Sequence, residues 1–225
     1  MKRIGKKIKH SVGKRIAGGK NVLKNIKRVG HSMKRIHRIK IFHISRLKLG
    51  KFKPKIKMQI EKGNFVIKTV EDAEELKKIL KLRFDVFYQE LLEKKSVIST
   101  DIDEFDFICD HLAVFDKEKQ KYVGTYRLNL SSFSHRFYSS QEFDIKNILA
   151  LPDVKLELGR ACVDKEYRTG VIIGLLWRGL AEYIRLSNTR FLFGCSSVKT
   201  MEKKDAGLLY LYLMKYHKAP DDMMV

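Results

Sequence analysis

The sequence predicts an α+β domain with a largely antiparallel sheet, preceded by a strongly basic N-terminal segment. The chain has 225 residues, 44% of them apolar, which is enough for one sizeable core plus an appendage. From residue 65 onward the apolar pattern indicates a helix, then several strands, and then a β-α-β-α unit. We therefore expect antiparallel strands first and helix-connected strands at the end.

The positive charge is confined to the N-terminal part of the chain. Residues 1–62 contain 22 Lys and Arg and one acidic residue, whereas the remainder contains 25 basic and 25 acidic residues. We therefore expect a basic extension over residues 1–54 and a folded domain over residues 55–225. Because that domain is neutral, no nucleic-acid partner is expected for it.

Apolar residues recur every three to four positions in the extension, for example at Ile4, Ile8 and Val12, with Lys and Arg between them. Interspersed glycines weaken such a helix in water by up to about 1 kcal/mol each. An anionic membrane surface would accept both faces, at roughly 1 kcal/mol per cation. We expect peripheral binding to the inner face of the cell membrane. A solvated, disordered tail and a nucleic-acid or organelle-targeting segment are the alternatives.

Cysteine usage and hydropathy indicate the compartment. The three scattered cysteines, Cys109, Cys162 and Cys195, do not make a disulfide framework and suit a reducing environment. No apolar run reaches the roughly 18 to 20 residues that span a bilayer, and the basic N-terminus lacks the apolar stretch of a signal peptide. We therefore expect a cytoplasmic protein.

Two strands and a long helix are expected first in the domain. Residues Lys55–Ile60 and Phe65–Val70 read as strands joined by a Gly63-Asn64 turn. Asp72 provides a variant of the helix N-cap pattern. The spacing of the apolar residues after it predicts a helix over about 71–91.

An acidic loop then leads to Asp110. Two apolar, β-rich runs separated by a Lys/Glu/Gln turn predict an antiparallel pair, His111–Asp116 and Lys121–Leu130. The remaining chain is expected to contain a strand, a helix, a strand and a helix: Val154–Val163, Thr169–Ser187, Phe191–Ser196 and Asp205–His217. An apolar stripe in the last helix is expected to pack in the core or to face an acyl tunnel: Leu208, Leu209, Leu211, Tyr212 and Met214.

Six segments in order resemble the ornithine-lipid N-acyltransferases: LRFDVFYQE (82–90), DEFDFICDHL (103–112), VGTYRL (123–128), LELGRACVDKEYR (156–168), LLWRGLAEY (175–183) and LFGCSS (192–197). That group has the GNAT fold, is sometimes labelled hemolysin-like, and is similar in scaffold to the acyl-homoserine-lactone autoinducer synthases. The resemblance covers about half of the chain, and the six segments are specific only together. It implies a GNAT-type domain whose mixed, mostly antiparallel central sheet is flanked by helices.

The resemblance also implies an activity. It points to an N-acyltransferase that moves a (3-hydroxy)acyl chain from acyl carrier protein to the amino group of ornithine or a similar small amino acid, giving a lyso-aminolipid. No permanently bound cofactor and no metal are expected. Because the GNAT phosphate loop survives only loosely, as YRTGVIIG (167–174), acyl carrier protein is favoured over acyl-CoA as donor. The alternatives are an acyl-homoserine-lactone-type synthase and a non-enzymatic basic protein that binds membranes or nucleic acid.

The catalytic residues implied by the resemblance are Glu157 and Arg160. Acyl transfer needs a neutral amine, and a strand carboxylate such as Glu157 can accept its proton. The alternative is that Glu157 and Arg160 simply pair and hold a loop. Residues three apart on a regular strand face opposite sides, so the two share a site only if Leu158-Gly159 forms a bulge.

The substrate-binding residues implied by the resemblance are Asp103, Asp106, Arg83 and Arg127. The acidic run DIDEFDFICD (101–110) suits a cationic acceptor such as ornithine, although a solvated acidic loop is the alternative. Arg83 and Arg127 are expected to pair with these aspartates or with the acceptor carboxylate.

The donor side is expected along the central strand. The resemblance implies that this strand splays and offers backbone N–H groups to the thioester and the phosphopantetheine arm, at Gly159, Cys162 and Arg168. Cys109 and His111 are two residues apart and could be imagined as a nucleophile and its base. Buried cysteine usually behaves as a small apolar residue, so we do not favour that role.

Overall fold

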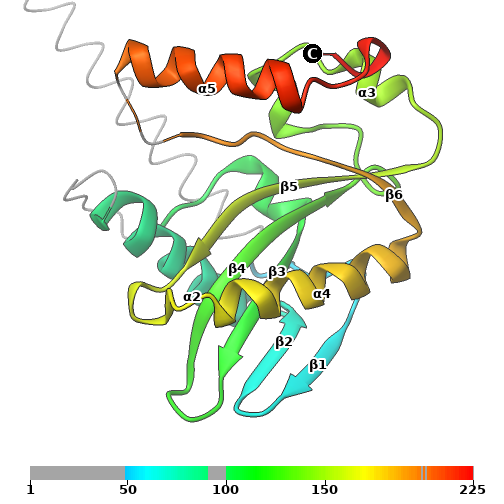
Figure 1. Cartoon of the computed structure of the whole chain (residues 1–225). Helices are drawn as coiled ribbons and strands as arrows, with labels where there is room; N and C mark the ends of the chain where they lie inside the picture. The colour runs from blue at the N-terminus through cyan, green and yellow to red at the C-terminus, as the bar shows by residue number, and fades with distance from the viewer. Residues whose placement is uncertain (1–48, 91–99, 199, 201, 225) are drawn as a thin grey trace, which may run out of the picture. The chain divides into compact units, whose positions relative to one another are not determined.

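A computed structural model describes residues 49–90, 100–198, 200 and 202–224 (Figure 1). The chain divides into two compact units, Met1–Gly50 and Lys51–Val225. Nearly all of the predicted basic extension over residues 1–54, with its predicted membrane-binding helix, lies outside the described residues. The domain boundary after residue 54 stays a prediction.

One six-stranded sheet forms the centre of the second unit, and its strand order follows the sequence, β1-β2-β3-β4-β5-β6. Neighbouring strands are antiparallel up to β5, and β6 pairs parallel to β5. This confirms the predicted mixed, mostly antiparallel sheet. The strands are β1 (Gln59–Lys62), β2 (Phe65–Thr69), β3 (Asp110–Asp116), β4 (Lys121–Leu130), β5 (Val154–Val163) and β6 (Thr189–Phe193).

The first hairpin differs from the prediction at its start. Gly63 adopts the left-handed conformation that the predicted turn requires (φ 57°), and β1 runs up to this turn. The predicted strand began at Lys55. In the structure the backbone N–H groups of Lys55 and Ile56 instead donate to the Asp110 carboxylate, at 2.8 and 3.0 Å. A side chain therefore fixes this segment before the strand ladder begins.

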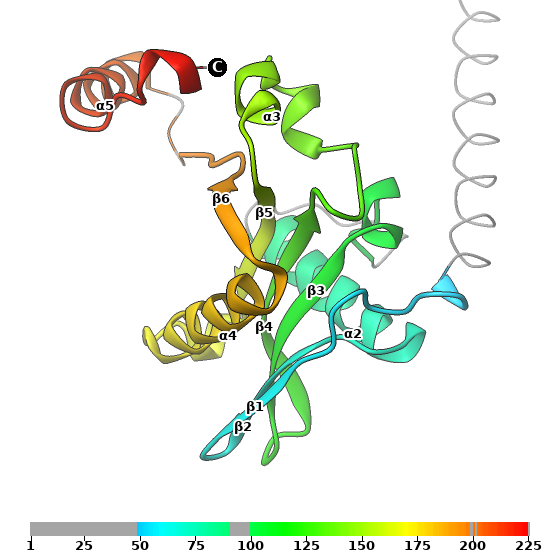
Figure 2. The ribbon, with the colours of Figure 1, turned by 90° about the vertical axis from the view of Figure 1, so that its right-hand side faces the viewer.

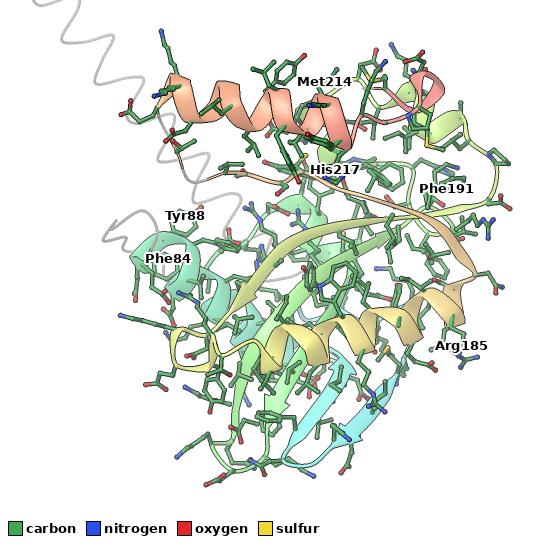
Figure 3. All side chains as sticks on the ribbon, viewed as in Figure 1. Phe84, Tyr88, Arg185, Phe191, Met214 and His217 are labelled. Atoms are coloured by element: carbon green, nitrogen blue, oxygen red, sulfur yellow. The ribbon has the colours of Figure 1, made fainter. Side chains whose placement is uncertain are left out.

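Two helices cover opposite faces of the sheet (Figure 2). Helix α2 (Ala73–Phe84) is capped by Asp72, which accepts hydrogen bonds from the first turn, and it continues as a π-helical segment, η1 (Asp85–Glu90). The helix predicted over about 71–91 thus begins at Ala73 and continues to Glu90, the last described residue before a gap. Figure 3 shows Phe84 and Tyr88 side by side across the α2–η1 junction, with ring centroids 5.3 Å apart.

Helix α4 (Val171–Ser187) packs its apolar side on the other face. It begins after Gly170, whose φ of 92° is a backbone conformation that residues with a β-carbon rarely adopt. At Gly179 a β-carbon would lie 2.5 Å from Ile67, so the helix rests directly on the sheet. The core between them is built of fully buried apolar side chains, including Leu112, Leu128, Leu156, Leu176 and Leu180.

The last helix, α5 (Lys203–Tyr216), lies away from this core (Figure 3). None of its described residues is buried, and Leu208, Leu211 and Tyr212 are 58%, 64% and 52% exposed. The prediction that its apolar stripe packs in the core is therefore wrong. The reason is geometric, because α2 and α4 already cover the two faces of the sheet. Among the described residues, no helix is both long and apolar enough to cross a membrane.

Candidate functional site

The sheet opens between its last two strands. Strands β5 and β6 pair from Val154–Thr189 to Glu157–Phe193. Beyond this point β5 continues to Val163, whereas the chain after β6 leads away toward α5 (Figure 1). Strand β6 therefore ends earlier than the predicted Ser196. The edge of β5 after Glu157 is left without a paired strand in the described part of the chain, as the predicted splay requires.

Just past the last β5–β6 pair, the segment after β6 still passes very close to β5. A β-carbon at Gly194 would lie 2.2 Å from the carbonyl oxygen of Leu158, so a larger residue there must displace backbone. We expect Gly194→Ala to lower the free energy of unfolding by about 1–3 kcal/mol. Gly159→Ala is the matched control, because a β-carbon at Gly159 has no atom within 4 Å. Urea unfolding of both variants tests this, and equal losses would contradict the close approach.

A bulge in β5 lies beside this opening. Thr125 pairs with Cys162 and Arg127 pairs with Gly159, so β5 has one residue more than β4 between these pairs. The extra residue falls within Arg160–Ala161, and Arg160 has a left-handed backbone (φ 50°). The predicted bulge at Leu158-Gly159 is therefore placed too early. The guanidinium of Arg160 lies 3.3 Å from Asp103, which also binds Arg127, and the sharing of one site by Glu157 and Arg160 stays a prediction.

Arginines and aspartates form a buried ionic network on the α2 face of the sheet. The guanidinium of Arg83 is fully buried and donates to Asp101 from Nε (2.8 Å) and to Asp106 from Nη1 (2.6 Å). Nη1 of Arg127 donates to Asp103 at 2.7 Å and to Asp106 at 3.1 Å. Of the two roles expected for Arg83 and Arg127, the structure shows the pairing with aspartates.

The surroundings of Asp106 and Arg83 keep these two groups charged. Burial disfavours the charged form of Asp106, but the neighbouring charges of Arg83, His111 and Arg127 outweigh burial and hold the pKa of Asp106 well below its usual range. Burial likewise opposes the charge on Arg83, and Asp106 and Asp101 nevertheless raise its pKa. Sequence reasoning did not single out Asp101. The available signal was its place two residues before Asp103 in the same acidic run.

Glu157 has a different environment. Its carboxylate accepts hydrogen bonds from the backbone N–H groups of Tyr138 (3.0 Å) and Ser139 (2.6 Å) and from Asn129 Nδ2 (3.1 Å). Glu157 has no ion pair with any described residue, and the alternative Glu157–Arg160 pair is therefore not formed. The Glu157 carboxylate thus holds the chain after β4 against β5.

Tyr138 connects the two sides of the site. Its ring lies 5.8 Å from the guanidinium carbon of Arg160 and 5.9 Å from that of Arg127, while its backbone N–H binds Glu157. It comes from η3 (Tyr138–Gln141), far from β5 in the sequence. The two predicted catalytic residues therefore both contact Tyr138, Arg160 at its ring and Glu157 at its backbone N–H.

The predicted donor residues follow β5 away from the bulge. Gly159 is opposite Arg127, and Cys162 is buried opposite Thr125, where burial raises the pKa of its thiol to about 12. Arg168 lies beyond the end of β5 and pairs with Glu90 at 2.8 Å. Gly159 directly precedes the bulge, and Cys162 and Arg168 lie between the bulge and the start of α4. None of the three belongs to the ionic network.

The side chains of Cys109 and His111 are both buried in the domain, where they pack rather than face a substrate. Burial raises the pKa of the Cys109 thiol to about 12 and lowers the pKa of His111 to about 4. His111 Nε2 donates to the carbonyl oxygen of Asp106 at 3.1 Å, while Nδ1 has no hydrogen-bond partner among the described residues. A thiol held protonated is a poor nucleophile. The described residues also contain no group of three side chains able to hold a metal ion.

The depressed pKa of His111 predicts a pH dependence of stability. Between about pH 6.5 and pH 4 the unfolded chain binds a proton at His111 that the folded chain does not. The free energy of unfolding should therefore fall as the pH is lowered through this window, by up to about 3 kcal/mol. His111→Gln removes the titration but retains a hydrogen-bond donor. Urea unfolding at a series of pH values should show a shallower slope for this variant, and an unchanged slope would contradict the assignment.

Comparison with known proteins agrees with this architecture. A family model described as acetyltransferase (GNAT) domain matches residues 82–178. The L-ornithine Nα-acyltransferase of Brucella abortus (strain 2308) is 37% identical over 149 residues, which are 60% of this chain and 53% of that protein. The enzyme of the same name from Rhodobacter capsulatus is 31% identical over 172 residues, 71% of this chain and 66% of that protein. The chain thus spans roughly half to two thirds of the length of these relatives.

Among solved structures, the AHL synthase LasI has 16% identity and a TM-score of 0.45, covering 70% of this chain and 78% of its own. The relatives and the domain match confirm the resemblance drawn from the six segments. The chain therefore contains a GNAT acetyltransferase domain, and its sequence is similar to those of L-ornithine Nα-acyltransferases.

Proposed function

We propose that this chain is an N-acyltransferase that transfers an acyl chain from a carrier thioester to the α-amino group of ornithine. The relatives at 31% and 37% identity are named L-ornithine Nα-acyltransferases, which supports the acceptor and the acyl transfer. The structural observation that supports it is the coincidence of two features on β5. After Glu157 the strand no longer pairs with β6, and at Arg160 it bulges. An unpaired backbone edge therefore lies next to the polar site formed by Arg160 and the ionic network.

The reaction needs no covalent enzyme intermediate. The neutral α-amine attacks the thioester carbonyl carbon, the C–S bond breaks, the thiol leaves, and the amine loses a proton. Backbone N–H groups on the unpaired edge of β5 are our candidates for stabilising the oxyanion. Gly159 and Cys162, the donor residues implied by the resemblance, flank the bulge, and Leu158 is the residue whose backbone faces the segment after β6.

Glu157 is our candidate for the proton acceptor. The aspartates of the network are each bound to an arginine, whereas Glu157 is bound only by neutral donors among the described residues. Its two backbone donors fix the orientation of the carboxylate. A positioned carboxylate that accepts a proton from the attacking amine is the usual role of such a group.

The acceptor would lie against the exposed part of the network. Asp103 and Arg160 have side chains 25% and 31% exposed, whereas those of Asp101 and Asp106 are 3% exposed or less. Within the predicted substrate-binding set, Asp103 is therefore the residue able to meet a cationic acceptor directly. Arg83, Arg127 and Asp106 then have a supporting role, because they hold Asp103 and its loop in place.

The donor is proposed to be acyl carrier protein rather than acyl-CoA, with no permanently bound cofactor. Arg168 is our candidate for contact with the phosphate of the phosphopantetheine arm, although its pairing with Glu90 must then be exchanged. The basic extension over residues 1–54 would attract an acidic carrier protein or hold the enzyme at the inner face of the membrane.

The test uses the full chain with 3-hydroxyacyl carrier protein and ornithine, followed by mass spectrometry of the products. An Nα-acylornithine formed only when all three are present would support the proposal. An equal rate with the matching acyl-CoA would overturn the carrier-protein assignment. If no acceptor amino acid yields an amide while the protein is folded, the proposed function fails.

A further inference from the structure

The three arginines of the site do not have equivalent surroundings. Arg83 is fully buried, and three of its donor–acceptor contacts are with Asp101 and Asp106 at 3.3 Å or less. Arg127 is 5% exposed, and its guanidinium lies between Phe105 and Tyr138, 5.5 and 5.9 Å from the ring centroids. Arg83 therefore cannot take a further ligand without breaking a buried ion pair, and Arg127 has almost no exposed surface at which a ligand could reach it.

Arg160 has unused hydrogen-bonding capacity. Its side chain is 31% exposed, and its hydrogen bond to Asp103, from Nη2, is long at 3.3 Å. Nε is buried 3.6 Å from Asp101 Oδ2 without a hydrogen bond to the described residues, and none of those residues binds Nη1, so Nη1 and the second N–H of Nη2 are the groups left for a ligand. A guanidinium offers five N–H groups in a fork that matches a carboxylate. Part of this fork is therefore free for a ligand.

The backbone at Arg160 gives an independent reason to look for a ligand. A φ of 50° is unfavourable for any residue with a β-carbon, and glycine would adopt it without strain. Such strain persists when the side chain is needed at that point. Here the bulge turns Arg160 onto the face of Arg127 and Glu157, beside Tyr138 and next to the opening between β5 and β6.

We infer that Arg160 binds the α-carboxylate of the acceptor and thereby selects α-amino acids over other amines. This rests on the proposed function and deepens it. The carboxylate binds the N–H groups of Nη1 and Nη2 that are left over, while Asp103, 3.3 Å from Nη2, stays beside the acceptor's positive charge. Arg160 is then a specificity residue, and the role of Arg83 and Arg127 is to hold the aspartates that position it.

The test compares ornithine with ornithinamide, which keeps both amino groups but lacks the carboxylate. The wild type is expected to prefer ornithine in kcat/KM. In Arg160→Gln this preference should fall by about 10- to 100-fold, as expected when a charge-assisted hydrogen bond is lost. The change should be mainly in KM for ornithine, with KM for the acyl donor unchanged. Arg160→Lys, which keeps the charge without the fork, should recover part of the preference.

Two further variants control this experiment. Arg136→Gln removes an arginine that is 61% exposed and near Phe105, and it should leave the preference unchanged. Arg160→Gly relieves the backbone strain, so it should fold and also lose the preference. An unchanged preference in both Arg160→Gln and Arg160→Gly overturns the inference, although amide formation itself would still support the acyltransferase. Failure of the wild type to acylate any amine would instead overturn the proposed function.

Discussion

Replacing Arg83 with methionine is expected to lower the free energy of unfolding by about 3–5 kcal/mol, the usual cost of removing one partner from a buried ionic network. The guanidinium has no exposed surface, and it is the cation shared by Asp101 and Asp106. Without it, the carboxylates of Asp101 and Asp106 stay buried but lose the positive charge that offsets the cost of burying them. Urea unfolding at pH 7 measures the loss. Arg168→Met is the matched control, because that ion pair is 43% and 26% exposed and should contribute less than about 1 kcal/mol.

The pH dependence of this effect distinguishes lost charge from lost packing. The depressed pKa of Asp106 stabilises the folded state above the carboxylate's ordinary pKa, and this contribution is lost as the pH falls. Arg83→Met removes the largest of the charges that lower this pKa, while Arg127 and His111 remain. The difference in stability between wild type and variant should therefore shrink below about pH 4. A difference that stays constant from pH 7 to pH 3 would mean that packing, and not the ion pairs, is what the variant loses.

Replacing Glu157 with glutamine is expected to lower kcat about 10²- to 10⁴-fold, the range typical for removal of a general base. The exchange keeps the size of the side chain and removes its ability to take the proton. Tyr138 and Ser139 bind different oxygens of Glu157, so the glutamine amide keeps an acceptor for one of them and loses the other bond, and the fold should be retained with a small loss of stability. Single-turnover kinetics with 3-hydroxyacyl carrier protein and ornithine measure the chemical step, and thermal unfolding verifies the fold.

Glu157 also tethers a loop, so a loss of rate alone does not establish its role as a base. Asn129→Leu removes one hydrogen bond to the Glu157 carboxylate and leaves the carboxylate itself in place. If Glu157 acts as the base, kcat should fall only slightly in Asn129→Leu and strongly in Glu157→Gln. Comparable losses in the two variants would assign Glu157 to loop positioning and exclude it as the proton acceptor.

The elements whose signals are local were predictable from the sequence. Strands β4 and β5 occupy the predicted residues, the turn forms at Gly63, and Asp72 caps α2. Each signal lies within a few residues of the structure that it specifies: a β-rich run, a glycine with positive φ, or a capping side chain.

Features that depend on distant partners were not predictable in the same way. Arg83 is buried because Asp101 and Asp106, about 20 residues later, meet it, and a helix pattern carries no information about them. The bulge was expected at Gly159 because glycine permits unusual backbone angles, yet Arg160 adopts the positive φ. In α5, apolar spacing indicated a buried face, and the number of helices the sheet can accept decided otherwise.

The order of the strands has a consequence for how this protein folds. The order of the strands in the sheet is their order in the sequence. Four of the five pairings are antiparallel pairs of consecutive strands, which need no crossover connection. The fifth, β5 with β6, must wait until the 17 residues of α4 have docked. Loop closure slows such pairings, and it slows the pairing of β2 with β3 more, because Phe65 and Asp116 are further apart in the sequence than Val154 and Thr189. The segment between β2 and β3 carries Arg83 and the aspartates that bind it, so the ionic network is expected to form together with the slowest pairing of the sheet.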